Sequence, residues 1–258
     1  INEGLTISGK SMREHLEVLN HNEAIDYIKD LVQNEISISE RQVLSIHNLI
    51  LRGIYPEDAG KYRKVQVMIK GSKHMPPQPF LVAKEMEELY LWYFENKKRL
   101  HPVILAAEMH ERLVFIHQFI DGNGRTSRLL MNLILLQNGY VIANIKGELT
   151  SRMKYYNALE SCHAEKNKEN FLLFIAQTEL DCLERYISIL KPSNDSSATT
   201  SVPLIAAKRI RKDCHPFPFS SSCSVVPFPL SAYWIKIRSF SSRISSSHSV
   251  ASACFKVF

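Results

Sequence analysis

Twelve residues near the middle of the chain, HQFIDGNGRTSR (117–128), hold most of the side chains that could do chemistry. They stand between two segments with helical spacing of apolar residues, so the second helix would begin inside this string. A helix N-terminus presents unpaired N–H groups and binds anions. Gly122 and Gly124 would let the backbone approach a ligand closely. Arg125 and Arg128 would place two guanidinium groups on one helical face, so the string predicts a phosphate site.

Two further residues of the string suggest what happens to those phosphates. A carboxylate in a site built for anions is explained most simply by a divalent cation, Mg²⁺, that bridges Asp121 to the phosphates. As an alternative, Asp121 would cap the following helix. His117 ends the preceding helix, and the pKa of histidine suits proton transfer near neutral pH. These groups together are those of phosphoryl or nucleotidyl transfer.

The elements that must position the string are mostly helices. Ser11 and Glu14 form a capping-box pattern, Ser39 is a second candidate N-cap, and Pro102 suits the first turn of a helix. Residues 62–82 contain the β-prone run KVQVMI followed by several prolines, which predicts a short edge hairpin. The fold class is therefore all-α, a helical bundle with a short β-hairpin. Apolar spacing predicts helices over residues 11–34, 39–53, 83–97, 102–117, 123–138, 150–164 and 169–190.

Several histidines lie outside the string. His110 falls on the apolar stripe of its helix, two turns before His117, and is expected in the core or directly behind the site residues. The remaining candidates are expected at the surface or as capping groups: His15, His21, His47 and His101.

The charge of the chain is unevenly distributed. Residues 191–258 hold nine Lys or Arg and two Asp or Glu, so the +6 net charge belongs to this tail and the rest of the chain is near neutral. A basic composition therefore does not favour a nucleic-acid partner here. The tail is rich in Ser and Pro, keeps no helical or strand period, and is expected to be disordered. The domains expected are a linker remnant at 1–10, a folded domain at 11–191 and the tail at 192–258.

Other classes of protein can be set aside from the composition. No apolar run of the length needed to span a membrane is present, and the cysteine spacings fit neither a zinc site nor a disulfide framework. The first residues, INEGLTISGK, read as the interior of a longer protein, so the cytoplasm is only a default location.

The 117–128 string resembles the signature of the Fic (filamentation induced by cAMP) family, HxFx[D/E]GNGRxxR, at every defined position. Gln118 takes a variable place where proline is common. The similarity extends over residues 10–190, through GKSMREHLEVLNHNEAIDYI, the AGKYRKVQVMIKGSKHMPPQPFLV region, HPVILAAEMHERLVFIHQF, RLLMNLILLQNGY and SRMKYYNALESCHAEKN, in family order.

The resemblance implies a protein adenylyltransferase, which moves AMP from Mg·ATP to a Ser, Thr or Tyr hydroxyl of a target protein. His117 would be the general base and Asp121 would hold Mg²⁺, while Phe119 would pack into the core and fix the loop. The nucleotide-binding residues implied are Gly122, Asn123 and Gly124 as a backbone anion hole, Arg125 and Arg128 on the β- and γ-phosphates, and Tyr155 and Tyr156 near the adenine.

Other residues matching the family pattern concern the target protein and the nucleotide base. A flap containing Ile69, Lys70, Gly71 and His74 would hold an extended target segment by strand addition. His163 stands where the family often has Asn, and Cys162 where Ala is frequent, which puts the adenine contacts in question.

Alternative functions stay open at this point. They are removal of AMP from a modified protein, transfer of phosphate, UMP or phosphocholine, and a non-enzymatic peptide-binding module. Many members carry an inhibitory helix with the pattern [S/T]xxxE[G/N]; Glu3-Gly4 lacks the Ser or Thr, so that helix is expected upstream in an autoinhibited parent. A homodimer is common for such proteins, and the target protein is not legible.

Overall fold

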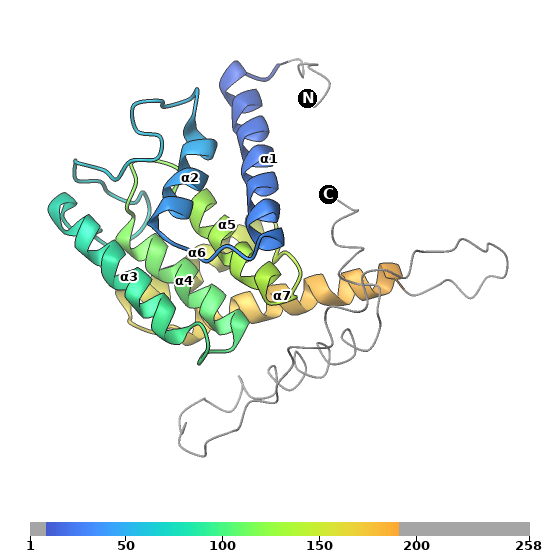
Figure 1. Cartoon of the computed structure of the whole chain (residues 1–258). Helices are drawn as coiled ribbons and strands as arrows, with labels where there is room; N and C mark the ends of the chain where they lie inside the picture. The colour runs from blue at the N-terminus through green and yellow to red at the C-terminus, as the bar shows by residue number, and fades with distance from the viewer. Residues whose placement is uncertain (1–8, 191–258) are drawn as a thin grey trace. The chain divides into compact units, whose positions relative to one another are not determined.

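Helices make up most of the structure, a computed structural model that describes residues 9–190 (Figure 1). The linker remnant at 1–10 is described only from residue 9, and the tail at 192–258 lies outside the described residues. The helices confirm the predicted order, and no strand is assigned within 9–190. Their bounds are α1 Met12–Gln33, α2 Glu40–Leu51, η1 Pro79–Leu81 (a 3₁₀ turn), α3 Val82–Asn96, α4 Pro102–Ile116, α5 Asn123–Gln137, α6 Leu149–Ala164 and α7 Glu169–Leu190.

The chain divides into two compact units. Among the described residues, the larger unit contains 9–138 and Ile145–Ile175, and the smaller contains Gly139–Asn144 and 176–190. All of the 117–128 string falls in the larger unit.

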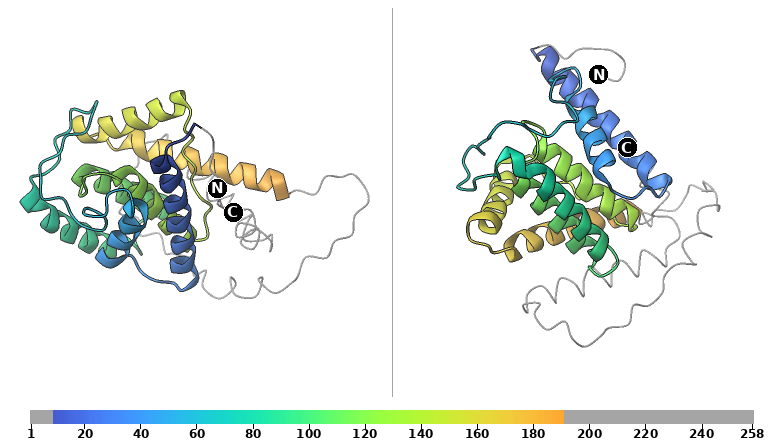
Figure 2. Two further views of the ribbon diagram at one scale, coloured as in Figure 1. Left: turned by 90° about the horizontal axis from the view of Figure 1, so that it is seen from above. Right: turned by 60° about the vertical axis from the view of Figure 1, so that its left-hand side comes forward.

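The core of the larger unit is built on the hairpin of α4 and α5. Helices α1 and α2 lie side by side (Figures 1 and 2) and pack against α5, while α3 packs against α4. Both α4 and α5 carry fully buried apolar side chains, and burying each one contributes about 1.5–3 kcal/mol. They include Leu105, Met109 and Leu113 of α4 and Leu130, Leu133 and Ile134 of α5.

Local capping explains where the helices begin. The capping box of α1 is confirmed: the Glu14 N–H donates to Ser11 Oγ (3.2 Å) and the Ser11 N–H donates to Glu14 Oε2 (2.9 Å). The Ser11 N–H, with the Lys10 ammonium (3.1 Å) and the Ser11 hydroxyl (3.1 Å), donates to the Glu14 carboxylate and lowers its pKa to about 2. The expectation for Ser39 is half right, since it is the N-cap of α2 but its hydroxyl contacts the Gln42 side chain instead of a backbone N–H. His101 caps α4 as predicted by accepting from the Val103 N–H at Nδ1 (3.3 Å).

The predicted β-hairpin at residues 62–82 is not formed. This segment turns at Ile69, whose carbonyl accepts from the Ser72 N–H (3.2 Å), but its two arms carry no assigned strand pairing. Side chains replace the ladder: Gln66 Nε2 donates to the Pro76 carbonyl (3.0 Å), and the guanidinium of Arg63 donates to the Pro77 carbonyl. Two consecutive prolines supply no N–H groups, so the returning arm cannot complete a ladder.

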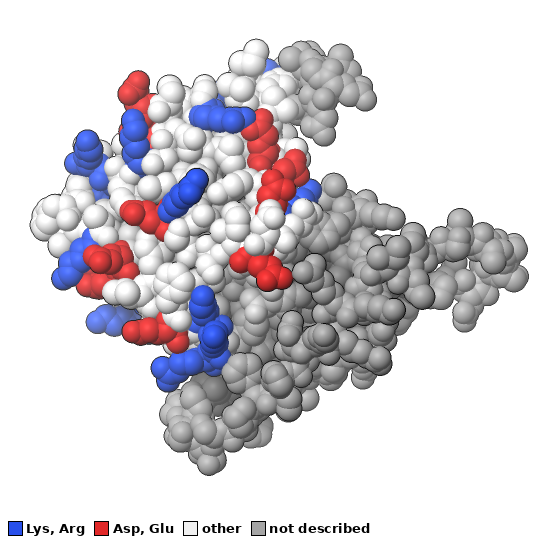
Figure 3. Space-filling model, in the orientation of Figure 1, with Lys and Arg blue, Asp and Glu red and all other residues white. Residues whose placement is uncertain are grey.

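The surface of the described part carries charges of both signs, interspersed across the face seen in Figure 3. Among residues 9–190, no helix combines the length and the hydropathy needed to cross a bilayer.

The smaller unit contains a buried carboxyl group. Glu179 is 0% exposed, and its Oε1 accepts the Val141 N–H (3.1 Å). Among residues 9–190 its Oε2 has no hydrogen-bond partner, and burial raises the pKa of Glu179 to about 8. Glu179 is therefore protonated in the folded protein at neutral pH.

This raised pKa predicts a stability that falls with rising pH. Between pH 4.5 and 8 the folded chain holds a proton at Glu179 that the unfolded chain releases, so the free energy of unfolding falls by at most about 1.4 kcal/mol per pH unit. Glu179→Gln should flatten this slope in urea unfolding measured from pH 6 to 9. The exposed Glu184→Gln is the control, and equal slopes in wild type and Glu179→Gln would contradict the prediction.

Candidate active site

A cavity of about 270 Å³ lies at the turn between α4 and α5. Helix α5 begins at this turn, so its first N–H groups face a space that a ligand can enter. The structure thus brings together the residues that the sequence proposed for the base, metal and nucleotide. The lining residues are His117, Ile120, Asp121, Gly122, Asn123, Gly124, Arg125, Arg128, Tyr155 and Tyr156.

His117 ends α4 in the left-handed conformation, with φ 50° and ψ 53°. A residue with a side chain adopts this conformation at a cost of roughly 1–2 kcal/mol, so other contacts must hold it. Arg63 provides them: its Nε donates to the His117 carbonyl (2.8 Å), and its backbone N–H donates to the Gln118 carbonyl (3.0 Å). Arg63 is buried, and its guanidinium also donates to Val65 and Pro77 carbonyls.

The environment of His117 keeps its imidazole neutral. Burial lowers the pKa of His117 to about 4; the Val114 carbonyl opposes this shift, and the positive charge of Arg63 reinforces it. A neutral imidazole at physiological pH can accept a proton, which is the property that a general base needs.

Phe119 and Asn123 fix the shape of the turn from inside. Phe119 is 0% exposed, as predicted. The Asn123 side chain binds the Phe119 backbone at both ends: Oδ1 accepts from the Phe119 N–H (2.9 Å) and Nδ2 donates to the Phe119 carbonyl (2.8 Å). The amide of Asn123 is therefore occupied, and only its backbone is free to face a ligand.

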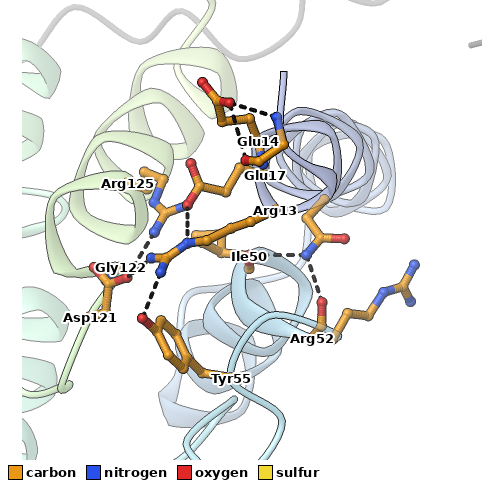
Figure 4. A network of polar contacts seen from close by, with 11 residues as sticks. Arg13, Glu14, Glu17, Ile50, Arg52, Tyr55, Asp121, Gly122 and Arg125 are labelled. Atoms are coloured by element: carbon orange, nitrogen blue, oxygen red, sulfur yellow. Dashed lines mark hydrogen bonds and ion pairs between the residues drawn. The ribbon is translucent and has the colours of Figure 1, made fainter. Parts of the chain in front are cut away.

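Asp121 lies between two guanidinium groups (Figure 4). Its Oδ2 is 3.3 Å from Arg125 Nη2 and 3.9 Å from Arg13 Nη2. Arg13 comes from α1, and it is oriented toward the turn by Glu17 of the same helix (3.2 Å) and by the hydroxyl of Tyr55, which follows α2 (2.8 Å). Sequence reasoning missed Arg13, because nothing in its neighbours along the chain indicates a contact with Asp121.

The alternative prediction, that Asp121 caps α5, is wrong. The N-cap of α5 is Gly122, and Asp121 Oδ1 accepts a hydrogen bond from the N–H of Gly122 itself (2.6 Å).

The described residues contain no cluster of three or more His, Cys, Asp or Glu side chains that could hold a metal alone. A single half-exposed carboxylate beside a helix N-terminus does fit Mg²⁺, which is commonly held by one or two carboxylates together with substrate phosphates.

Arg128 lies against the first turn of α5. A Cβ at Gly124 would lie 3.3 Å from Arg128 Nη1, so glycine at this position leaves room for the guanidinium beside the backbone.

The two tyrosines at the cavity, Tyr155 and Tyr156, differ in burial. The hydroxyl of Tyr155 is 2.9 Å from His110 Nε2, and both residues are buried. This confirms His110 as a core residue. Tyr156 keeps its ring more than half exposed at the cavity.

The flap residues proposed from sequence do not line the cavity. Ile69, Lys70, Gly71 and His74 all lie in the loop between α2 and η1, whose tip is held by Glu160 of α6. Glu160 accepts from Ser72 Oγ (2.5 Å) and from the Lys73 N–H (2.8 Å).

His74 and His163 form part of this loop's attachment. His74 Nε2 lies 2.8 Å from the Phe115 carbonyl, and its ring is 4.8 Å from that of His163. His163 Nε2 is 3.5 Å from Glu111 Oε1, away from the cavity lining. The departure from Asn at position 163 therefore affects the support of the loop.

The expectation that His47 is a surface or capping residue is wrong. His47 is 0% exposed and lies directly beneath the turn, where its Nε2 is 3.0 Å from the Asp121 carbonyl. Burial lowers the pKa of His47 to about 4. Its place on the apolar face of α2, four residues after Val43, was the available signal of burial. His15 is also buried and bonds its own helix at the Ser11 carbonyl (2.8 Å).

The fold and the turn define a helical domain in which the N-terminus of α5 and a histidine of lowered pKa line one cavity. Residues 37–135 match the model of the Fic/DOC family. Proteins named "Protein adenylyltransferase Fic" are similar: that of Drosophila melanogaster is 38% identical over 186 residues, covering 72% of this chain and 36% of its own length. The Nematostella vectensis protein of that name is 37% identical over 202 residues, covering 78% of this chain and 44% of its own length.

Solved structures agree with this grouping. Fic-1 (residues 134–508) from C. elegans superposes with a TM-score of 0.66 at 31% identity, covering 73% of this chain and 56% of that one. A Fic-domain-containing signaling protein from Bacteroides thetaiotaomicron gives 0.61 at 28% identity, covering 72% and 74%. This chain belongs to the Fic/DOC family through this domain. It spans less than half the length of the two curated relatives.

A side chain at Gly122 should destabilise the domain. Gly122 (φ +79°) and Gly53 (φ +74°) are both left-handed, and alanine there costs about 1–2 kcal/mol. A Cβ at Gly122 would also lie 3.3 Å from two atoms of the His47 ring, whereas at Gly53 the nearest atom is 4.0 Å away. Urea unfolding should therefore show a loss for Gly122→Ala that exceeds that of Gly53→Ala by roughly 1 kcal/mol. Equal losses would mean that the His47 ring moves freely.

Proposed function

We propose that this domain is a protein adenylyltransferase that moves AMP from ATP, in the presence of Mg²⁺, to the hydroxyl of a Ser, Thr or Tyr on a target protein. The observation that carries the proposal is the cavity, in which a neutral His117 faces the same space as the N-terminus of α5 and its two arginines. The names of the Drosophila and Nematostella relatives support the same activity.

The roles of the residues follow from their positions. The target hydroxyl gives its proton to His117 and its oxygen attacks the α-phosphorus of ATP; the bond from that phosphorus to the bridging oxygen breaks, and pyrophosphate leaves. The first N–H groups of α5, at Asn123 and Gly124, stabilise the charge on the phosphate oxygens. Arg125 and Arg128 bind the outer phosphates, which orients the triphosphate along the cavity.

The remaining groups complete the substrate sites. Asp121 would hold Mg²⁺, which supplies positive charge against the phosphates. Tyr156, exposed at the cavity, offers a ring face to the adenine. The loop with Ile69, Lys70, Gly71 and His74 would receive the target segment, while a homodimer and a cytoplasmic location stay predictions.

Removal of the base should strongly reduce transfer and leave nucleotide binding. The full chain is incubated with Mg²⁺, lysate proteins and ATP labelled on either the α- or the γ-phosphate. His117→Ala should reduce protein labelling from the α-phosphate by about 100-fold or more, because general-base catalysis is worth that much. The affinity for ATP should change little.

The control for this assay is His101→Ala, which removes a helix cap on the same helix outside the cavity. It should lower stability by about 1 kcal/mol and leave transfer intact. Label arriving from the γ-phosphate would indicate phosphate transfer in place of AMP transfer. Bound ATP with no label on any protein would favour a binding module.

The pKa of His117 predicts an unusual pH profile. Because the pKa of His117 is lowered to about 4, the imidazole stays neutral as the pH falls through 6.5, the ordinary value for histidine. The ratio kcat/KM for transfer should therefore stay nearly flat between pH 6.5 and 5.5 and fall only at lower pH. ATP affinity measured at each pH separates binding from chemistry. A half-loss of kcat/KM near pH 6.5 at constant ATP affinity would contradict the assignment.

A further inference from the structure

His47 lies outside the cavity lining yet contacts the turn that forms it. It comes from α2, and none of its side chain is exposed. Both ring nitrogens have backbone partners: Nδ1 is 3.0 Å from the Gly60 nitrogen, and Nε2 is 3.0 Å from the Asp121 carbonyl oxygen. One imidazole thus joins the loop after α2 to the turn before α5.

These two contacts determine where the proton of His47 resides. The Gly60 N–H can only donate, so Nδ1 of His47 must be the acceptor. In a neutral imidazole the proton is then on Nε2, which donates to the Asp121 carbonyl. Each hydrogen-bonding group of the ring is satisfied once, so the ring has no freedom to rotate or flip without losing a buried hydrogen bond.

The orientation of the Asp121–Gly122 peptide follows from that hydrogen bond. In a trans peptide the carbonyl and the N–H of the next residue point in opposite directions. Since the Asp121 carbonyl points to His47, the Gly122 N–H points away from it, and there it donates to Asp121 Oδ1 (2.6 Å). His47 therefore fixes the backbone of the turn, and through it the place of the Asp121 carboxylate.

The same ring touches the turn at two more points. It stacks on Phe119 with the ring centroids 3.5 Å apart and the planes 3° from parallel. It also lies against Gly122, where a Cβ would approach two ring atoms to 3.3 Å. Residues 119, 121 and 122 thus rest on one flat, fully buried surface.

We propose that His47 is a positioning residue for the nucleotide site: by donating Nε2–H to the Asp121 carbonyl it sets the peptide plane that orients both the Asp121 carboxylate and the start of α5. It touches neither nucleotide nor target. The inference deepens the proposed function and rests on it for the identity of the ligand. It gives His47 a role beyond filling the core, because one specific hydrogen bond carries the effect.

Three substitutions separate that hydrogen bond from packing. His47→Gln keeps a donor near the position of Nε2 and can still reach the Asp121 carbonyl. His47→Asn offers a polar group only near the position of Nδ1, and so can serve Gly60 alone. His47→Phe keeps the ring and its stacking on Phe119 but makes neither hydrogen bond.

The experiment uses the full chain and three measurements: the ATP affinity with Mg²⁺ by calorimetry, hydrogen exchange of the backbone amides at 121–124, and the Tm. We expect ATP affinity to fall about tenfold in His47→Asn and His47→Phe and to return to within about threefold of wild type in His47→Gln. Exchange at residues 121–124 should rise about tenfold in the first two variants and return in the third. Exchange within α4, at residues 103–113, is the internal control and should stay unchanged in His47→Gln and His47→Asn.

The proposal would be overturned if His47→Gln and His47→Asn had equal ATP affinity and equal amide exchange at 121–124, whether or not their Tm values differ. His47 would then be a packing residue. If His47→Phe does not fold, the comparison of His47→Gln with His47→Asn is enough to test the proposal. If wild type binds no ATP, the proposed function fails. Hydrogen exchange of the amides at 121–124 in the three variants would then still show whether His47 positions the turn.

Discussion

The buried guanidinium of Arg63 is the interaction on which the rest of the site depends. A charged group that is 3% exposed is stable only when its donors are used, and Arg63 gives them to the carbonyls of His117, Val65 and Pro77. One side chain therefore holds the left-handed end of α4 and both arms of the loop between α2 and η1. The position of the base and the shape of the neighbouring loop are set by the same residue.

The turn after His117 is a rigid piece of backbone with few free polar groups. Arg63 binds the carbonyls of His117 and Gln118, Asn123 binds both backbone groups of Phe119, and His47 binds the carbonyl of Asp121. With the carbonyls directed inward, N–H groups and arginines are left for the cavity. A site built in this way can stabilise phosphate charge without reorganising, which is where electrostatic catalysis gains most of its effect.

The periodic and local features of this fold were predictable, and the distant contacts were not. Apolar spacing located the helices, and the Ser11–Glu14 pattern located the start of α1, because these depend on residues within one or two turns. The motif likewise placed the lining residues from His117 to Arg128. His47, Arg63 and Arg13 were missed, since their partners come from other elements. The hairpin prediction was wrong because it counted β-prone residues at 64–69, whereas Pro76 and Pro77 of the returning arm supply no N–H groups for pairing. Side chains bind the carbonyls of these two prolines instead.

The sequence distance between the partners at the turn also orders the assembly of the domain. Helices α4 and α5 are joined by six residues and can pair early, whereas His47 and Asp121 are 74 positions apart and Arg63 and His117 are 54 apart. Closing such long loops has a larger entropic cost, so we expect these contacts to form after the hairpin of α4 and α5. A transient detachment of α2 would reverse the last step alone. The helices of the hairpin would stay paired, and the backbone between them would lose the shape that receives a ligand.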